Sequence, residues 1–403
     1  MGLGTIGPGT ARIILESCKK IVENPIWRVP KSRSHDINRR LRNQIEAALA
    51  PILYEDWWDS QRIVVDFEKK FGDETGYAFT SAVQSGAAGL RLALLACGVK
   101  AGDEVITVAN SDMATTASIS QCGAMPVFCD VRTSDYNINP DLVESLITER
   151  TKVILPVDLY GHPVDVKSLK QIADRHGIYI IEDACIAMGA EDYGKPIGYF
   201  ATMTVFSTAA GKPVLSAGGG GIVVTSREEL WEKVETLKGY GRRPEENLTV
   251  PEKYDHVVEG YNLRMVPVDA ALLRLKMPYF KEWSDQRRQV AAWYAAGLHD
   301  LPEISIPVFR PESKPIFRTY TVCAKNRDGL YRHLRGKGVQ ASLNYVPAVH
   351  LQTVYKNRHV PGSDDLPVTE YLSEQLLCLP VDPMHTRDEI SYVCEQINEY
   401  YSS

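Results

Sequence analysis

Helical and strand patterns alternate along the chain from about residue 62 to residue 280. Runs such as "EVITVA", "PVFCDV", "MTVFS" and "GIVVTS" are short and apolar, as strands are, and helix-like runs lie between them. The run "IYIIEDAC" is apolar at nearly every position before its acidic pair, which is typical of a strand covered on both faces. The alternation predicts an α/β fold with a mainly parallel sheet, helices on both faces, and ligands at the carboxyl ends of the strands.

The rest of the chain divides around this region. Residues 1–60 are polar and carry the basic cluster "KSRSHDINRR", so we expect an N-terminal arm with a helix near 37–53. We interpret the cluster as a solvated helix start, with contact to a substrate phosphate as the alternative. A large domain is expected over 61–285. A long helix near 281–299 would link it to a smaller C-terminal α+β domain over 286–403.

Composition restricts the classes of function. The net charge of −6 argues against nucleic acid or an anionic membrane as a partner, although an anionic small substrate needs only a local positive pocket. The eight cysteines show no C-x-x-C spacing, so no zinc or redox motif is indicated, and they suit a reducing compartment. No signal peptide and no apolar run of about 18–20 residues is visible. We therefore expect a cytoplasmic protein.

The stretch "FSTAAGKPVLSAGGGG" places Lys212 among small residues and between two apolar strand runs. Exposed lysines usually stand among polar neighbours, so we expect Lys212 to be buried and chemically active. A desolvated lysine also loses its proton more easily. The glycines at 218–221 predict a tight loop between the two strands.

Two other stretches complete the candidate site. "QSGAAG" opens a helix, where backbone N–H groups and the helix dipole favour an anion. "IIEDAC" ends a buried strand with Glu182 and Asp183, and a buried carboxylate is costly unless it pairs with a cation. Taken alone, the acidic pair is better interpreted as a helix N-cap.

Together, a helix start that binds phosphate, a strand-end Asp183 and a buried Lys212 are what pyridoxal 5'-phosphate requires. The lysine amine forms a Schiff base with its aldehyde, and the aspartate pairs with the pyridinium nitrogen so that the ring accepts electrons. Ser207 and the helix start would hold the phosphate. A P-loop does not fit, because its G-x-x-x-x-G-K-[ST] pattern would fall on Phe206 at its first position and on Pro213 at its last.

From about Phe67 to the C-terminus, the chain resembles the DegT/StrS-type sugar aminotransferases, a branch of the fold-type I pyridoxal phosphate enzymes. The resemblance rests on ordered stretches that include "FEKKFGDETGYAF", "GAMPVFCDV", "IIEDACIAMGA", "VFSTAAGKPVLSAGGGGIVVT", "GYNLRM" and "NYVPAVHLQTVY". It implies the fold-type I architecture, with a large cofactor-binding domain and a smaller C-terminal domain. It implies that Lys212 is the Schiff-base lysine and Asp183 the pyridinium partner, with phosphate contacts from Gly86, Ala87 and Ser207.

The resemblance also implies partners and an activity. Asn262 in "GYN" would reach the phosphate across a dimer interface, which implies a homodimer with shared active sites. Tyr345 and His350 would contact substrate, although His350 is equally open to a structural hydrogen-bonding role. The implied reaction moves an amino group from glutamate or glutamine to a keto sugar, often nucleotide-linked, or to a keto-cyclitol. Such reactions belong to natural-product or surface-glycan pathways.

The chain departs from the family pattern around the expected cofactor. The Thr–aromatic pair of the family is Ser111–Asp112 here, and the glutamine after the aspartate is Ile186. Asp112 would place a carboxylate near the reacting carbon, where it could bind a cationic group or act as a base. These departures favour an altered substrate with an unchanged type of reaction. Asp158, Met188 and Asn344 stand where the family has histidines, and Gly219 stands where it has a glutamate.

Two other functions stay open. One is a pyridoxal phosphate-dependent dehydratase or deoxygenase acting on a keto sugar. In the sugar dehydratases of this family a histidine replaces the lysine, so Lys212 argues against it. The other is a non-catalytic regulator or sensor, which the retained Lys212 and Asp183 oppose and the altered Asp112 and Ile186 keep open.

Overall fold

A seven-stranded sheet lies at the centre of the computed structural model, which describes residues 27–54, 57–244, 255–358 and 360–402. The strand order is β1-β9-β8-β5-β4-β2-β3. Only β9 runs against its neighbours, so the predicted mainly parallel sheet is confirmed. The strands are β1 (Phe79–Val83), β2 (Glu104–Val108), β3 (Met125–Cys129), β4 (Thr151–Ile154), β5 (Tyr179–Asp183), β8 (Met203–Ser207) and β9 (Gly221–Thr225).

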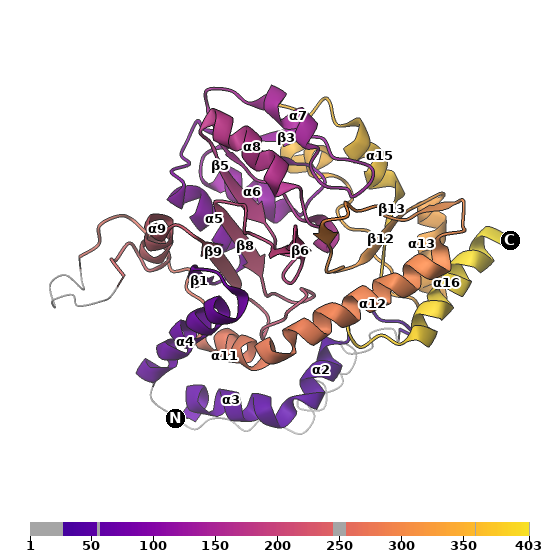
Figure 1. Cartoon of the computed structure of the whole chain (residues 1–403), viewed down its shortest axis with the longest axis horizontal. Helices are drawn as coiled ribbons and strands as arrows, with labels where there is room; N and C mark the ends of the chain where they lie inside the picture. Colours follow the sequence, from indigo (N-terminus) through magenta and orange to yellow (C-terminus); the bar gives the residue numbers. More distant parts are fainter. Residues whose placement is uncertain (1–26, 55–56, 245–254, 359, 403) are drawn as a thin grey trace, which may run out of the picture.

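Helices cover both faces of this sheet (Figure 1). On β8, Val205 belongs to the apolar cluster under one layer of helices, and its neighbour Phe206 belongs to the cluster on the opposite face. Because successive side chains of a strand point to opposite faces, both faces need apolar residues. This explains the continuous apolar runs in the sequence. The helices around the sheet are α4 (Trp57–Thr75), α5 (Gly86–Ala96), α6 (Met113–Gln121), α7 (Pro140–Val143), α8 (Val166–His176), α9 (Glu228–Lys238) and α11 (Pro267–Lys276).

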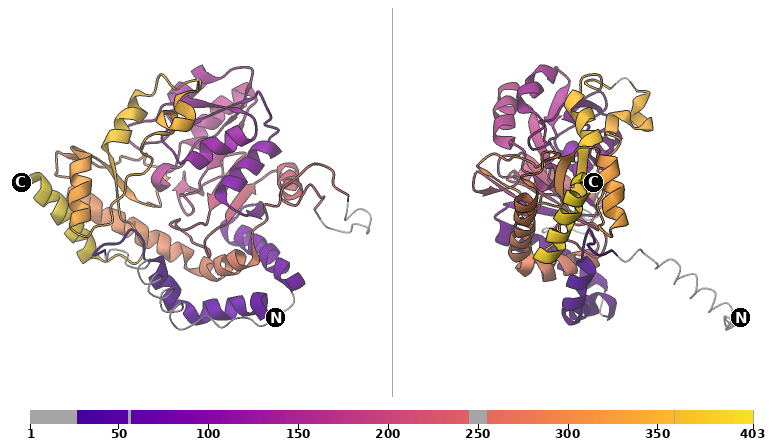
Figure 2. Two further views of the ribbon diagram at one scale, coloured as in Figure 1. Left: turned by 180° about the vertical axis from the view of Figure 1, so that it is seen from behind. Right: turned by 90° about the vertical axis from the view of Figure 1, so that its right-hand side faces the viewer.

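A smaller antiparallel sheet, β10-β12-β13, forms a second unit towards the C-terminus. Helix α12 runs from the end of α11 to this unit, where it packs on α16 (Figure 1). Figure 2 shows these C-terminal elements, in orange and yellow, at one side of the central sheet. The elements are α12 (Phe280–Leu298), β10 (Ile304–Ser305), β12 (Tyr320–Ala324), α13 (Arg327–Gly336), α14 (Thr353–Lys356), α15 (Pro367–Gln375), β13 (Leu376–Leu379) and α16 (Arg387–Ser402). A third small sheet joins β6 (Glu191–Asp192), β7 (Lys195–Pro196) and β11 (Ser313–Lys314).

The helix expected near 37–53 is present as two helices, α2 (Ser34–Arg40) and α3 (Arg42–Tyr54), and α3 packs on α11. The segment before them lies along the C-terminal unit, where the fully buried Val29 pairs with Val339. Residues 1–26 of the expected arm lie outside the described residues. The domain boundaries expected after residues 60 and 285 fall inside α4 and α12, and they stay predictions.

Among the described helices, none combines the length and apolar composition needed to span a bilayer.

Candidate active site

The carboxyl ends of four strands bring the predicted residues together. Asp183 is the last residue of β5 and Ser207 the last of β8, while α5 begins just after β1 and α6 just after β2. These four strands run in the same direction, so their carboxyl ends meet at one edge of the sheet. This is the edge where open α/β sheets bind ligands.

The first turn of α5 packs directly against Ser207. A Cβ atom at Gly86 would lie 2.6 Å from Sγ of Cys185 and 2.9 Å from Cβ of Ser207, so only glycine fits at this position. Ser85 caps the helix by accepting a hydrogen bond of 3.1 Å from the N–H of Ala88. The N–H groups of Gly86 and Ala87 have no partner inside the helix and remain for a ligand. The geometry fits a phosphate group held between α5 and Ser207.

Asp183 is almost fully buried, and both of its carboxylate oxygens accept hydrogen bonds. Oδ2 accepts from Oγ1 of Thr115 at 2.7 Å, and Oδ1 accepts from the N–H of Cys185 at 3.1 Å. Burial raises the pKa of Asp183, while these two hydrogen bonds and the positive charge of Lys212 lower it. No helix begins directly after Asp183, since the next element is the strand β6, so the N-cap interpretation is wrong. A carboxylate has room for further donors, and a pyridinium N–H fits this need.

Thr115 is a site residue that the sequence did not reveal. Its hydroxyl lies 2.9 Å from the hydroxyl of Ser111, and both side chains are buried at the start of α6. Ser111, Thr115 and Asp183 therefore form one hydrogen-bonded row. The only sequence signal was the pair of hydroxyl residues four apart after a buried strand, a spacing that brings side chains together on a helix.

Lys212 stands in the loop that joins β8 to β9, two antiparallel neighbours whose ends pair at Ser207 and Gly221. The N–H of Thr208 donates to the carbonyl of Gly220 at 3.0 Å, and this closes the loop. Gly220 has a φ of +90°, and a Cβ on Gly221 would lie 2.6 Å from the carbonyl group of Ser85. The glycines thus form the predicted tight connection between buried strands.

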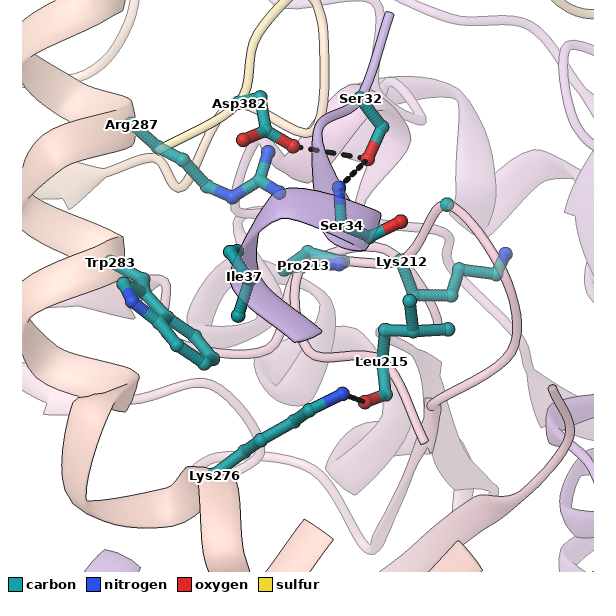
Figure 3. Close-up of a pocket in the computed structure, with 11 residues that line it drawn as sticks. Ser32, Ser34, Ile37, Lys212, Pro213, Leu215, Lys276, Trp283, Arg287 and Asp382 are labelled. Carbon is teal, nitrogen blue, oxygen red and sulfur yellow. Dashed lines mark hydrogen bonds between the residues drawn. The ribbon is translucent and has the colours of Figure 1, made fainter. Parts of the chain in front are cut away.

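The expectation that Lys212 is buried is wrong for the single chain. Its side chain is partly exposed, because it follows the exposed residues Ala210 and Gly211 at the outer part of the loop. Figure 3 shows its amine pointing away from Arg287 and Asp382. Its charge still reaches Asp183, whose pKa it lowers. The lysine and the aspartate are therefore close enough to interact electrostatically, but burial within this chain does not set the lysine apart.

Asp112 and Ile186 flank the site in different ways. Asp112 is the N-cap of α6, where its carboxylate accepts a hydrogen bond of 3.0 Å from the N–H of Ala114, and it is exposed. Its charge contributes to raising the pKa of Tyr345, after the larger effect of burial. Ile186 is buried just beyond Asp183. Contact of either residue with the cofactor stays a prediction.

The two residues predicted to contact substrate lie in different environments. Tyr345 is half-buried, and its ring stacks on that of Tyr160 with centroids 6.0 Å apart. His350 is buried with its ring edge against Phe128, and its Nε2 lies 3.3 Å from Oε1 of Glu370. The placement of His350 supports the structural alternative. Substrate contact by either residue stays a prediction.

Asn262 is exposed on a segment that lies beside the first turn of α5. The N–H of Gln84 donates to the carbonyl of Leu263 at 2.7 Å, and Arg264 pairs with Val83. The segment thus reaches the end of β1, directly before α5. The role of Asn262 across a dimer interface stays a prediction.

The replacement at Asp158 creates a buried pair of acids behind Asp183. Asp158 and Glu182 are both almost inaccessible to solvent. Burial raises the pKa of Glu182 to about 8, and burial together with Glu182 raises the pKa of Asp158 well above its ordinary value. Burial thus favours the neutral form of both acids, which reduces the negative charge next to Asp183.

The sequence matches the DegT/DnrJ/EryC1/StrS aminotransferase family over residues 39–398. A dTDP-3-amino-3,4,6-trideoxy-alpha-D-glucose transaminase from Streptomyces venezuelae is 36% identical over 367 residues, covering 89% of this chain and 93% of the relative. The erythromycin biosynthesis sensory transduction protein EryC1 from Saccharopolyspora erythraea is 36% identical over 353 residues, covering 88% of this chain and 94% of the relative. The crystal structure of DesV from S. venezuelae is similar with a TM-score of 0.87 at 35% identity, covering 93% of this chain and 99% of that one. These matches confirm the resemblance and the fold expected from the sequence.

Proposed function

Because the chain belongs to the DegT/DnrJ/EryC1/StrS aminotransferase family, we propose that it moves an amino group from glutamate or glutamine to a keto sugar or a keto-cyclitol. The protein is a pyridoxal phosphate-dependent aminotransferase. The sugar acceptor, with or without an attached nucleotide, is suggested by relatives such as the dTDP-sugar transaminase of S. venezuelae. Natural-product or surface-glycan biosynthesis is the proposed setting.

One observation carries the proposal: Lys212, Asp183 and the anion-binding turn of α5 lie at one edge of the sheet. When bound, pyridoxal phosphate supplies an electron-accepting ring and a carbon that exchanges amino groups. The turn of α5 and Ser207 would hold its phosphate. Asp183, fixed by Thr115, would accept the hydrogen bond of its ring nitrogen.

Lys212 has the remaining chemical task. Its amine, once free, would accept the proton that leaves the α-carbon of the amino donor and would donate it to the carbon at the cofactor's aldehyde position. The loop between β8 and β9 holds this amine near Asp183, and the small side chains around it leave space for a substrate. The charge of Asp112 at the start of α6 would favour a cationic group on the substrate.

We also propose a homodimer with shared active sites. The large apolar residues Tyr240, Val257, Val258 and Val266 are each at least 42% exposed, and they flank Asn262 in sequence. Apolar side chains that stay exposed in one segment support an interface there if they form a contiguous patch. Burial between two chains would bring Asn262 to the partner's site, as the family resemblance implies.

The proposed compartment is the cytoplasm. All cysteines within the described residues are free, which fits a reducing environment.

The first experiment follows the visible spectrum of the purified protein with pyridoxal phosphate in wild type and in the Lys212→Ala variant. The wild type should show the visible band of lysine-bound cofactor, and the variant should show free or loosely bound cofactor. Lys100→Ala removes an exposed lysine before β2 and should keep the wild-type spectrum. Equal spectra for wild type and Lys212→Ala would contradict the assigned role of Lys212.

The names of two relatives suggest a second function, that of a non-catalytic regulator or sensor. EryC1 is named a sensory transduction protein, and a 35% identical relative from Geobacillus stearothermophilus is named a pleiotropic regulatory protein. A regulator would bind the cofactor without turnover. The intact lysine–aspartate pair favours the aminotransferase, and it also disfavours a sugar dehydratase or deoxygenase.

A further inference from the structure

A cavity of about 300 Å³ lies beside the Lys212 loop, and its charged lining is basic. Lys31, Arg287 and Arg318 line it together with Gly211, the residue before Lys212. We call it the basic cavity. Its three cations come from segments far apart in the sequence: the N-terminal segment before α2, helix α12, and the stretch before β12.

Two of the three cations are held in place by side-chain hydrogen bonds, and the third by its backbone. Nζ of Lys31 donates to Oγ of Ser342 at 3.0 Å, and its backbone N–H donates to Oε1 of Gln340 at 2.7 Å. Arg287 is 6% exposed, and its Nη1 donates to a backbone carbonyl of the C-terminal unit at 3.0 Å. The backbone of Arg318 is fixed by its N–H, which donates to the carbonyl of Tyr160 at 2.9 Å. The cavity is therefore formed before any ligand arrives.

Positive charge in the basic cavity exceeds the negative charge nearby. Asp382 lies close enough to raise the pKa of Arg287, although burial has the larger, opposite effect. Its Oδ2 already accepts hydrogen bonds from Oγ of Ser32 at 3.0 Å and from the N–H of Arg33 at 2.9 Å. Figure 3 shows Asp382 between Arg287 and Ser32. One carboxylate thus stands against three cations.

Donor groups in the basic cavity also lack acceptors. Within the described part of the chain, the buried Nη1 of Arg318 and Nε of Arg287 have no hydrogen-bond partner. Burial lowers the pKa of Lys31 to about 8, and the charges of Arg318 and Lys212 add to this effect. Buried cations with unused donors are unfavourable unless an anion joins them.

The basic cavity adjoins the Lys212 loop of the candidate active site. The second terminal nitrogen of Arg318, Nη2, lies 3.1 Å from the position that a Cβ of Gly211 would take. The charge of Arg318 also lowers the pKa of Tyr345, against the larger effect of burial, and Asp183 acts on the same tyrosine. An anion bound here would thus lie next to the loop that carries the reactive amine.

We propose that the basic cavity binds an anionic group, a carboxylate or a phosphate, of a substrate that reacts at Lys212. The inference rests on the proposed function and adds a subsite to it. The planar guanidinium of Arg318 suits either group, because it donates two parallel hydrogen bonds. Two sources share this chemistry, the carboxylate of the amino donor and an anionic group on the acceptor. Lys31 is the first residue of the basic cluster "KSRSHDINRR", and it is the one basic residue of that cluster that lines the cavity. For Lys31, this placement supports the alternative that the cluster binds an anion.

The test measures binding by calorimetry to the cofactor-loaded full chain. Glutarate serves as the dicarboxylate probe and inorganic pyrophosphate as the phosphate probe. Arg318→Gln should weaken the binding of one probe at least tenfold, and Arg318→Lys should recover part of the loss. Arg332→Gln removes an exposed arginine on α13 and should leave both affinities unchanged. Lys31→Gln, which keeps the backbone bond to Gln340, provides a second variant if Arg318→Gln does not fold.

The two sources give different results. Selective loss of glutarate binding, with a raised KM for glutamate in the first half-reaction, assigns the subsite to the donor. Selective loss of pyrophosphate binding assigns it to the acceptor. The inference is overturned if the wild type binds neither probe, or if folded Arg318→Gln or Lys31→Gln binds both as the wild type does. A wild type that binds a probe through Arg318 but never exchanges an amino group would contradict the proposed function instead.

Discussion

At the scale of single residues, the proposed chemistry depends on how Asp183 is held. Thr115 and the backbone of Cys185 satisfy its oxygens inside the protein, and Lys212 supplies the nearby positive charge. Burial alone would favour the neutral acid, which could not pair with a protonated ring nitrogen. The hydrogen bond from Thr115 therefore stabilises the charged form that the chemistry needs.

Replacing Thr115 with valine should weaken cofactor binding while the fold survives. Valine keeps the shape but removes a hydrogen bond to a carboxylate, worth about 1.5–3 kcal/mol, so the Kd for pyridoxal phosphate should rise roughly tenfold or more. The adjacent Thr116→Val is a matched control, because Thr116 is equally buried and its hydroxyl has no partner among the described residues. Equal affinity in the two variants, measured by quenching of intrinsic fluorescence, would show that Thr115 does not support Asp183.

The sequence revealed the residues of the site that local pattern marks. Lys212 stood out among small residues, and Asp183 stood out at the end of an apolar run. Thr115 and Arg318 did not, because each acts through a contact between distant parts of the chain. The burial of Lys212 was predicted wrongly for a related reason. Its apolar neighbours in sequence lie on strands, while the lysine itself stands on the loop between them.

At the scale of elements, the close approach of α5 to β8 shapes the turn that we propose binds the phosphate. Gly86 permits this approach, since a side chain there would collide with Cys185 and Ser207. The helix must begin at this point for its free N–H groups to face the edge of the sheet. The same approach explains why Gly221, opposite Ser85, also lacks a side chain.

Gly86→Ala should displace the turn and lower cofactor affinity. Crowding of this kind costs about 1–3 kcal/mol, so both the melting temperature and the affinity for pyridoxal phosphate should fall. Gly336→Ala in α13 is the control, because a Cβ there meets no atom within 4 Å. Thermal unfolding with and without cofactor separates the two effects. If Gly86→Ala gained as much stability from cofactor as the wild type, the phosphate would not bind at this turn.

Most elements could be predicted because burial on both faces leaves a strong apolar signal. The strands β2, β3, β5, β8 and β9 and the long helix α12 follow from such patterns. Strands β1 and β13 were not identified. Short apolar runs such as "LLCL" are ambiguous, because periodicity alone does not separate a buried strand from a buried helix. The partners of β9 depend on contacts that no local pattern encodes.

At the scale of the whole molecule, the proposed homodimer predicts complementation between two inactive variants. In a mixed dimer, the site built on the Asn262→Ala chain keeps its own Lys212 and receives an intact Asn262 from the Lys212→Ala chain. The other site lacks both residues. A mixed dimer would thus contain one intact site if Asn262 acts across the interface. Co-expression should restore roughly a quarter of wild-type activity, since about half the dimers are mixed and each has one intact site.

The control for complementation pairs Lys212→Ala with Asp183→Asn. Both residues belong to the same site within one chain, so no mixed dimer regains an intact site. Activity should stay absent in this pair. An inactive mixture of Lys212→Ala and Asn262→Ala, with mixed dimers shown by mass spectrometry, would place Asn262 in the site of its own chain.

The proposal that the protein takes its amino group from glutamate or glutamine is tested most directly by one half-reaction, which is monitored by visible spectroscopy. Wild-type protein loaded with pyridoxal phosphate is mixed with glutamate or glutamine, without an acceptor. We expect the visible band to convert to that of the pyridoxamine form, with one equivalent of keto acid released, and we expect no conversion in Lys212→Ala. A stable visible band with both donors, in protein that has bound the cofactor fully, would contradict an aminotransferase that uses these donors.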